Sequence, residues 1–136
     1  MPLFVTTVIS QTKHMAERMV PMPFVDAKIT LPVSDAQREA IKSGLGEAIS
    51  VFGKGESWLM VGIDDEYSLW LGGRELEKGA FVSVSLIGDT PDEGCREFTA
   101  DICELLRSVL GIPGDSVYVT YHPMMRTRWG WNGATF

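Results

Sequence analysis

Hydrophobic and polar residues alternate along the stretch from Phe24 to Leu31. A period of two is typical of a β-strand that buries one of its faces. After Pro32 the spacing of the hydrophobic residues changes to that of an amphipathic helix with one buried stripe. This part of the chain therefore predicts a strand followed by a helix. The buried strand face holds Val25, Ala27, Ile29 and Leu31, and the buried helix stripe holds Ile41, Leu45, Ala48, Ile49 and Phe52.

The residues at the ends of this helix, and of a second helix further along, indicate where each one begins and ends. Ser34 is followed three positions later by Gln37, the pattern of a capping box, and Gly53 is a suitable C-terminal stop. The stretch Thr90–Glu93 repeats the starting pattern, with Thr as the cap and Pro at the first helical position. Gly111 is expected to end this second helix. Its buried face holds Phe98, Ile102, Leu105, Leu106 and Val109.

The two halves of the chain resemble each other in the order of their predicted elements. Further strands are predicted at Trp58–Ile63, Ser68–Leu71, Ala80–Ile87 and Ser116–Tyr121. Strand, helix and strand follow one another in both halves, which indicates a duplicated βαβ unit. Two such units predict an α/β (α+β) fold, with a four-stranded sheet and both helices on one face. Several strand residues are apolar on both sides, so the uncovered face favours self-association.

Composition limits the class of protein and its partners. The chain has 136 residues, a formal net charge of −6 and a pI near 4.8. One domain is expected at this length, and the negative charge argues against nucleic acids or an anionic membrane as partners. No apolar run approaches the roughly 18 residues of a membrane span. The first 22 residues make a poor signal peptide, so the cytoplasm is the expected location, with release without a signal peptide as the alternative.

The cysteines and histidines suggest neither a disulfide framework nor a metal site. Cys95 and Cys103 fall eight residues apart in one predicted helix, so their Cα atoms would be about 12 Å apart, too far to bridge. They are expected to be thiols in a reducing compartment. His14 and His122 have no partner at metal-ligand spacing. No cofactor or metal is predicted.

Two short motifs lie at a characteristic separation. The chain ends in Gly-Trp-Asn-Gly-Ala-Thr-Phe at residues 130–136, and Met-Pro-Phe-Val occupies residues 22–25. Together they resemble the macrophage migration inhibitory factor family of the tautomerase superfamily, over nearly all of residues 22–136. The resemblance implies a trimer of βαβ repeats with pockets at the subunit interfaces. Residues 23–136 would form this domain, and residues 1–22 would be an N-terminal extension or a mis-assigned start.

The resemblance gives Pro23 the catalytic role. A proline at a chain start has a free secondary amine, whose pKa begins near about 7.7–8.0 and falls in an apolar pocket or beside a cation. Such a base can take a proton from the carbon next to a carbonyl and allow it to return elsewhere, which is keto–enol tautomerisation. Within the chain as written, however, the nitrogen of Pro23 is an amide without basicity.

Two starting points are compatible with a proline base. Met22 as the true initiator would leave Pro23 as the first residue after trimming. Met1 is also followed by a proline, Pro2, and this start resembles the family as well. Pro2 is the weaker candidate, because residues 10–22 then lack a capped helix and the separation from the terminal motif fails.

Two residues correspond to positions that hold the substrate in the family. Lys54, in the turn after the first helix, would bind a carboxylate and acidify the amine; alternatively it is a cation at a helix C-terminus. Ile87 would contact the substrate through its backbone N–H, and a merely buried strand residue is equally compatible with the sequence.

The remaining candidates are aromatic or lie beside an aromatic residue. Tyr118 matches the strand that lends a tyrosine to the neighbouring subunit's pocket, and Thr120 stands where the family usually has asparagine. Trp131 and Phe136 would form pocket walls suited to an aryl substrate, or would anchor the tail between subunits. Trp129 is bulkier than the aliphatic residue common at its position.

The function predicted from these features is tautomerisation of a phenylpyruvate-like α-keto acid by a cofactor-independent homotrimer. Pro23 would be the general base. The second hypothesis belongs to another class: a cytokine-like signalling or binding protein, with a receptor as partner, which uses the same scaffold with little or no catalysis.

Overall fold

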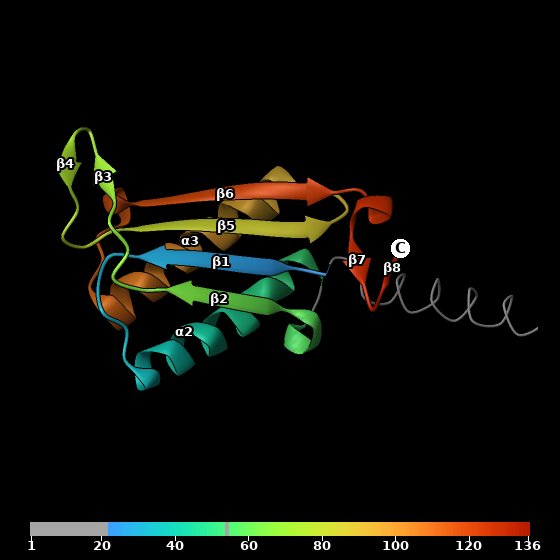
Figure 1. Cartoon of the computed structure of the whole chain (residues 1–136), viewed down its shortest axis with the longest axis horizontal. Coiled ribbons are helices and arrows are strands. Elements are labelled where there is room, and N and C mark those ends of the chain that lie inside the picture. The colour runs from blue at the N-terminus through green and yellow to red at the C-terminus, as the bar shows by residue number, and fades with distance from the viewer. Residues whose placement is uncertain (1–21, 54) are drawn as a thin grey trace, which may run out of the picture.

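A computed structural model describes residues 22–53 and 55–136 of the chain (Figure 1). These described residues form one four-stranded sheet, two α-helices, two small hairpins and four short 3-10 helices. The sheet strands are β1 (Phe24–Ile29), β2 (Met60–Asp64), β5 (Ala80–Ile87) and β6 (Val117–Met124). The helices are α2 (Asp35–Ala48) and α3 (Asp92–Leu110), and the hairpin strands are β3 (Trp70–Leu71), β4 (Arg74–Glu75), β7 (Gly130–Trp131) and β8 (Ala134–Thr135).

The sheet has the order β2-β1-β5-β6 and confirms the duplicated unit. β1 pairs with β2 in parallel and β5 pairs with β6 in parallel, each pair being joined through one helix. The two units meet where β1 and β5 pair in antiparallel fashion, with Phe24 opposite Ser85 and Ile29 opposite Ala80. A parallel pair needs a crossover connection, and the helices supply it.

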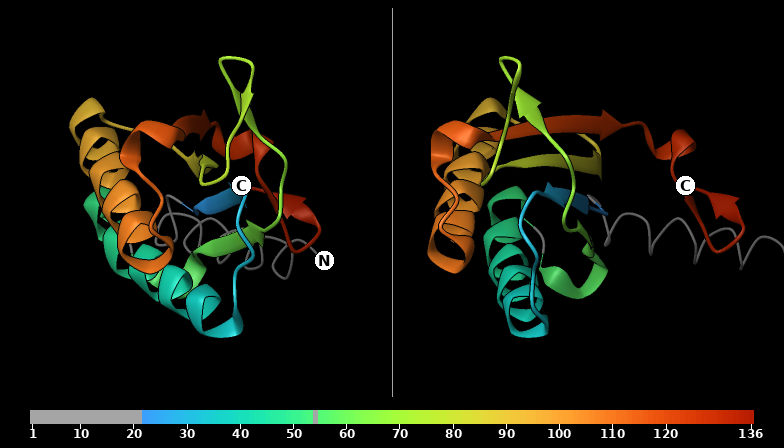
Figure 2. Two further views of the ribbon diagram at one scale, coloured as in Figure 1. Left: turned by 90° about the vertical axis from the view of Figure 1, so that its left-hand side faces the viewer. Right: turned by 60° about the vertical axis from the view of Figure 1, so that its left-hand side comes forward.

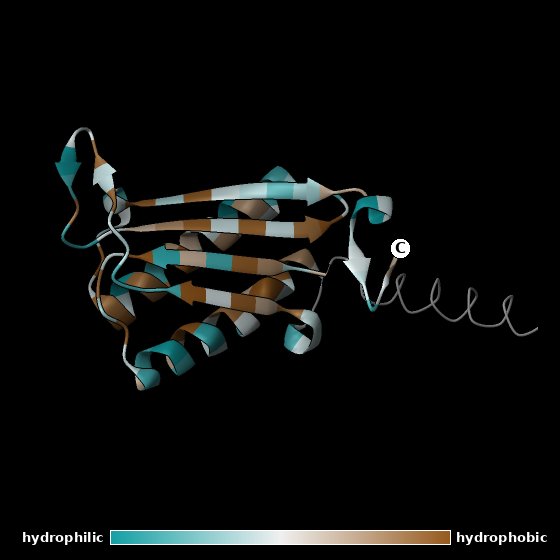
Figure 3. Cartoon of the chain, in the orientation of Figure 1, coloured by the Kyte–Doolittle hydropathy of each residue, from teal (hydrophilic) through white to brown (hydrophobic). Residues whose placement is uncertain are grey.

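Both helices cover the same face of the sheet, as predicted (Figure 2). Hydrophobic and hydrophilic residues alternate along β1 and β5, so one face of each strand contributes to the core (Figure 3). Burying this face against two amphipathic helices is the main source of stability in such a layered fold. The fully buried core residues are Val25, Ile29, Ile41, Ile49, Val82, Val84, Leu86, Phe98, Ile102, Leu106 and Ile112.

The helix starts follow the sequence in one case and depart from it in the other. At α2 the capping box is present: Gln37 N donates to Ser34 Oγ at 3.2 Å, and Ser34 N donates to the Gln37 side chain at 2.9 Å. At α3 the prediction of Thr90 as the cap was wrong. Pro91 is the N-cap residue and no side chain caps the helix. Pro91 is extended, with ψ of 139°, so the first helical residue is Asp92. Thr90 then lies one residue before the N-cap position and does not cap the first turn.

The predicted second strand also begins later than expected. Residues Glu56–Trp58 form a 3-10 helix, η2, and β2 begins only at Met60. Leu59 N donates to the carbonyl of Glu56 at 3.0 Å, which closes this turn. Trp58 is therefore presented from a turn at the sheet edge and not from within the ladder. The stop of α3 was predicted correctly, since its C-cap Gly111 adopts the left-handed conformation. α2 ends earlier than predicted, at Ala48, and the 3-10 helix η1 (Ile49–Phe52) continues from there to the left-handed Gly53.

Two hairpins extend the sheet at opposite ends (Figure 1). β3 and β4 are joined by Gly72-Gly73, and β7 and β8 by Asn132-Gly133, and all four turn residues have positive φ. Tight two-residue hairpins of this kind require that conformation, which Gly and Asn adopt at low cost. The terminal motif of the sequence is therefore a hairpin, a feature that its aromatic composition alone does not indicate.

The face of the sheet away from the helices is mixed rather than continuously apolar. Near the end of β1, Lys28 Nζ lies 3.5 Å from Asp26, 3.9 Å from Asp64 and 5.2 Å from the centre of the Tyr67 ring. Aromatic residues lie on this face at Phe24 and Tyr118. The structure describes no helix long and apolar enough to span a membrane within residues 22–53 and 55–136.

The cysteines are where the sequence placed them. Cys95 and Cys103 both lie in α3, half-buried and unbridged. Burial raises the pKa of the Cys103 thiol. This lowers the thiolate fraction at neutral pH, and a structural role fits Cys103 better than a reactive one.

Tyr121 fastens β6 to α3 and gives a prediction about alkaline stability. Its hydroxyl donates to the Cys95 carbonyl at 2.9 Å and lies 2.7 Å from Thr99 Oγ1, and burial raises its pKa to about 12. A raised pKa contributes stability that is complete below the ordinary value near 10 and lost as the pH rises towards 12. Because the group is only partly buried, solvent screening reduces the loss to the order of 1 kcal/mol.

Tyr121→Phe is expected to lower the free energy of unfolding at pH 7 by about 1–2 kcal/mol, since two hydrogen bonds are lost. Urea denaturation from pH 7 to 11.5 checks both effects. The difference between the wild type and the variant should shrink as the pH exceeds 10. A difference that stays constant over this range would contradict the assignment.

Candidate active site

Pro23 lies at the end of the sheet where β1 begins. It is buried, and its carbonyl accepts a hydrogen bond from Met60 N at 3.0 Å. Phe24 pairs with Ser85, and continuing this antiparallel register brings the residues before Phe24 alongside the end of β5, where Ile87 lies. Pro23 and Ile87, which are far apart in sequence, are therefore neighbours in space.

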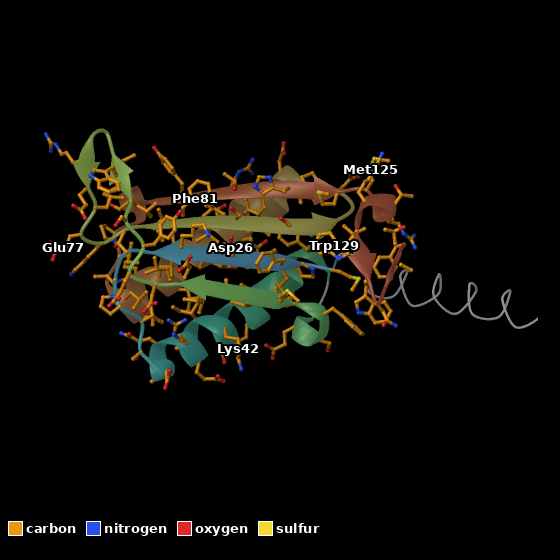
Figure 4. The ribbon with its side chains drawn as sticks, viewed as in Figure 1. Asp26, Lys42, Glu77, Phe81, Met125 and Trp129 are labelled. Carbon is orange, nitrogen blue, oxygen red and sulfur yellow. The ribbon has the colours of Figure 1, made fainter. Side chains whose placement is uncertain are left out.

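A second hydrophobic cluster, separate from the main core, occupies this end. Met22 and Ile87 are its buried members, and three half-buried aromatic residues pack against them: Trp129, Trp131 and Phe136. Figure 4 shows Trp129 beside the start of β1, with Phe81 and Glu77 towards the opposite end of the sheet. The structure thus brings together Ile87, Trp131 and Phe136, three of the residues predicted for the site, and the fourth, Pro23, directly follows Met22 of this cluster.

The aromatic rings of the cluster form a defined wall. Trp131 and Phe136 are stacked, with ring centres 6.1 Å apart and planes at 10°. Trp58 meets Trp131 edge to face at 5.8 Å and 87°. Both are favoured arrangements for aromatic pairs. Rings fixed in this way offer an apolar surface to a flat ligand.

Trp58 contacts the candidate site through Trp131, although the sequence did not single it out. Trp58 is the last residue of η2, and its side chain is 41% exposed at the edge of the aromatic wall. Its position four residues after Lys54 in the sequence, and just before the strand β2 that lies next to β1, was the signal available. Assigning Trp58 to a strand concealed this role.

The terminal hairpin is held in place by backbone bonds. Phe136 N donates to the Trp129 carbonyl at 3.3 Å, which closes the hairpin on itself. The 3-10 helix η4 (Arg126–Arg128) connects the hairpin to β6 and carries two arginines in an acidic protein. Two positive charges therefore lie close in sequence to the aromatic residues of the hairpin.

Two predicted residues are not brought into this cluster. Tyr118 pairs with Phe81 near the opposite end of the sheet and is 57% exposed. Thr120 lies on the same outer face, where its Oγ1 is 2.9 Å from His122 Nε2. Lys54 lies outside the described residues. Within one chain, then, Tyr118 and Thr120 are separated from Pro23.

The candidate site is lined by apolar and aromatic side chains. Among the described residues no group of three or more His, Cys, Asp or Glu side chains could hold a metal ion. The cluster around Met22, the residue before Pro23, is apolar and aromatic. A surface of this kind favours the uncharged form of any amine placed in it.

Comparison with known proteins agrees with this arrangement. The family model described as "Macrophage migration inhibitory factor (MIF)" matches residues 22–136. The chain belongs to the macrophage migration inhibitory factor family. A "Macrophage migration inhibitory factor homolog" of Trichuris trichiura is 28% identical over 115 residues, which cover 85% of this chain and 100% of that protein. The match begins at Met22, so residues 1–21 lie outside it.

Solved structures share the fold at low identity. MIF2 of Leishmania major has a TM-score of 0.79 at 24% identity, covering 86% of this chain and 99% of that chain. Two other structures share the fold. Pt0534 "Inactivated by 2-Oxo-3-pentynoate" has a TM-score of 0.74 at 16% identity, covering 82% of this chain and 94% of that chain. A fused 4-OT described as a "symmetric trimer" has a TM-score of 0.73 at 19% identity, with the same two coverages.

Proposed function

We propose that this family member is a cofactor-independent keto–enol tautomerase of aryl α-keto acids, active in the form whose first residue is Pro23. One observation carries the proposal: Pro23 is buried and directly follows Met22, which belongs to a cluster with Trp131 and Phe136 of the terminal hairpin. A buried proline at the start of a strand becomes a base once its nitrogen is freed. Superfamily membership supports isomerase chemistry of this general kind.

The base arises by hydrolysis of the Met22–Pro23 peptide bond. Water adds a hydroxyl to the Met22 carbonyl carbon and a proton to the Pro23 nitrogen, which becomes a secondary amine. The apolar surroundings disfavour the ammonium form and lower the amine's pKa from the usual range of about 7.7–8.0. The amine is then neutral in part at physiological pH and able to accept a proton.

The reaction is a proton transfer in two steps. Neutral Pro23 takes a proton from the carbon next to the keto group, and the electron pair of that C–H bond moves to form the enolate. The enolate oxygen then gains a proton, which gives the enol, and the reverse sequence restores the ketone. The Ile87 backbone N–H would stabilise the developing charge on oxygen.

Substrate selection follows from the charges and rings at the site. Trp131, Phe136 and Trp58 supply the apolar surface for an aryl group. Lys54 would bind the carboxylate of an α-keto acid. The superfamily relative Pt0534 was inactivated by a 2-oxo acid, which supports this substrate class.

A homotrimer would complete the site. Tyr118 and Thr120 are exposed or half-exposed on the outer face of β6, away from Pro23 of their own chain. A neighbouring copy that uses this uncovered face would supply Tyr118 and Thr120 to its pocket. The fused 4-OT with the same fold is described as a symmetric trimer, which supports the assembly.

The test compares the full chain with a chain that starts at Pro23, using phenylpyruvate enol–keto conversion followed by ultraviolet absorbance. Residues 23–136 hold all of the main hydrophobic core, so the shorter chain retains the residues that stabilise the fold. The chain starting at Pro23 is expected to be active and the full chain inactive. Equal turnover by both chains, or none by the shorter one, would overturn the proposal.

A further inference from the structure

Met22 has an unusual position for a residue that precedes a domain. Its side chain is 5% exposed and belongs to the aromatic cluster, together with Ile87, Trp129, Trp131 and Phe136. It is also covalently attached to Pro23. The residues that Met22 contacts are therefore those that would contact the apolar part of a ligand.

The side chain of Met22 is chemically suited to occupy the place of an apolar ligand. A methionine side chain is unbranched and polarisable, adapts to irregular apolar spaces, and its sulfur interacts favourably with aromatic rings. It resembles the aryl part of a substrate in being apolar, but it carries no carboxylate. It can therefore fill the apolar surface without using any cation at the mouth of the site.

We propose that Met22 is an intramolecular competitor, which occupies the aromatic cluster and keeps aryl ligands out for as long as it remains attached to Pro23. Processing would then do two things at once: it frees the amine and vacates the site. The inference rests on the proposed function only in taking this cluster as the ligand site. The amine and the occupancy of the site are separate matters and can be tested separately.

The competition is expected to be substantial. An attached side chain does not lose translational freedom when it binds, so a free ligand must displace a group present at high effective concentration. Burying a methionine side chain corresponds to roughly one to two powers of ten in an equilibrium constant. Emptying the position should therefore strengthen ligand binding by about tenfold or more.

The experiment uses the full chain and a ligand that cannot react. 3-Phenylpropionate carries an aryl group and a carboxylate but has no keto group to enolise. Its dissociation constant is measured by calorimetry and by tryptophan fluorescence for the wild type, Met22→Ala and Met22→Ser. Met125→Ala is the matched control, because Met125 is 69% exposed and is not part of the cluster. Met22→Leu keeps an apolar side chain of similar size in place.

The inference predicts that Met22→Ala and Met22→Ser bind 3-phenylpropionate at least tenfold more tightly than the wild type. Met22→Leu and Met125→Ala should bind as weakly as the wild type. Circular dichroism checks that each variant is folded, and two small substitutions guard against the failure of one. If the folded Met22→Ala and Met22→Ser chains bind no better than the wild type, the inference is overturned.

This result is independent of catalysis, because the Pro23 nitrogen is an amide in every chain compared. Tighter binding by Met22→Ala, together with no turnover by the chain starting at Pro23, would overturn the proposed function but support the role of Met22 as a competitor. Turnover by that chain, with unchanged binding in the Met22 variants, would support the proposed function and overturn the role of Met22 as a competitor.

Discussion

Adding a single alanine before Pro23, in the chain that otherwise starts there, is expected to lower kcat/KM for phenylpyruvate by about 10² to 10⁴. A positioned general base contributes a factor of this size. The added residue turns the Pro23 nitrogen into an amide, which has no lone pair available as a base. Alanine is much smaller than methionine, so this change removes the base without filling the aromatic cluster as Met22 does.

The measurement is steady-state turnover of phenylpyruvate, with 3-phenylpropionate binding measured on the same preparations. Binding should change little while turnover falls, which separates the loss of the base from a loss of access. Pro23→Gly in the processed chain is a useful companion, because it keeps a terminal amine but removes the ring that fixes its direction, and a smaller loss is expected. Unchanged turnover in the alanine-extended chain would exclude Pro23 as the base.

Phe98→Ala is expected to lower the free energy of unfolding by about 3–5 kcal/mol, the usual cost of emptying a buried phenylalanine site. Phe98 is fully buried on the face of α3 that packs against the sheet. Its ring meets that of Phe52 edge to face at 5.5 Å, so the cavity would also remove an aromatic contact between the two helical segments.

Urea denaturation at a fixed protein concentration checks this prediction, because assembly would make stability depend on concentration. Glu97→Ala is the matched control on the same helix: Glu97 is exposed and its replacement should change stability by less than about 0.5 kcal/mol. A loss below 1 kcal/mol for Phe98→Ala would mean that Phe98 is not part of the packed core.

The regular elements follow closely from local patterns. The alternation that begins at Phe24 and the helical stripe that includes Ile41 and Leu45 predicted β1 and α2 within a few residues. The limits Ala80–Ile87 of β5 agree with the structure. These features depend on residues a few positions apart, whose periodicity and capping bonds act within the segment itself. The family resemblance added Pro23 and the terminal motif, and the match over residues 22–136 confirmed the family.

The errors arose where a distant contact or a turn decided the outcome. Trp58 has the β-propensity of a strand residue, but the turn closed by Leu59 and Glu56 takes it out of the ladder. Thr90 is a residue type that often caps helices, but Pro91 is extended and is itself the N-cap residue, so the helix begins at Asp92. In neither case does residue type alone settle the backbone conformation, because propensity is weaker than the geometry of the neighbouring residues.

By itself, then, the sequence determined the two βαβ units, the side of each strand that is buried and the end of α3 at Gly111, because these depend on local periodicity and conformational preference. Only the tertiary structure decided that Met22 is buried, that Trp58 meets Trp131, and that Ile87 lies beside Pro23. These contacts join residues from separate elements. Their positions are set by the antiparallel register of β1 with β5 and by the fold of the terminal hairpin, which no single segment specifies.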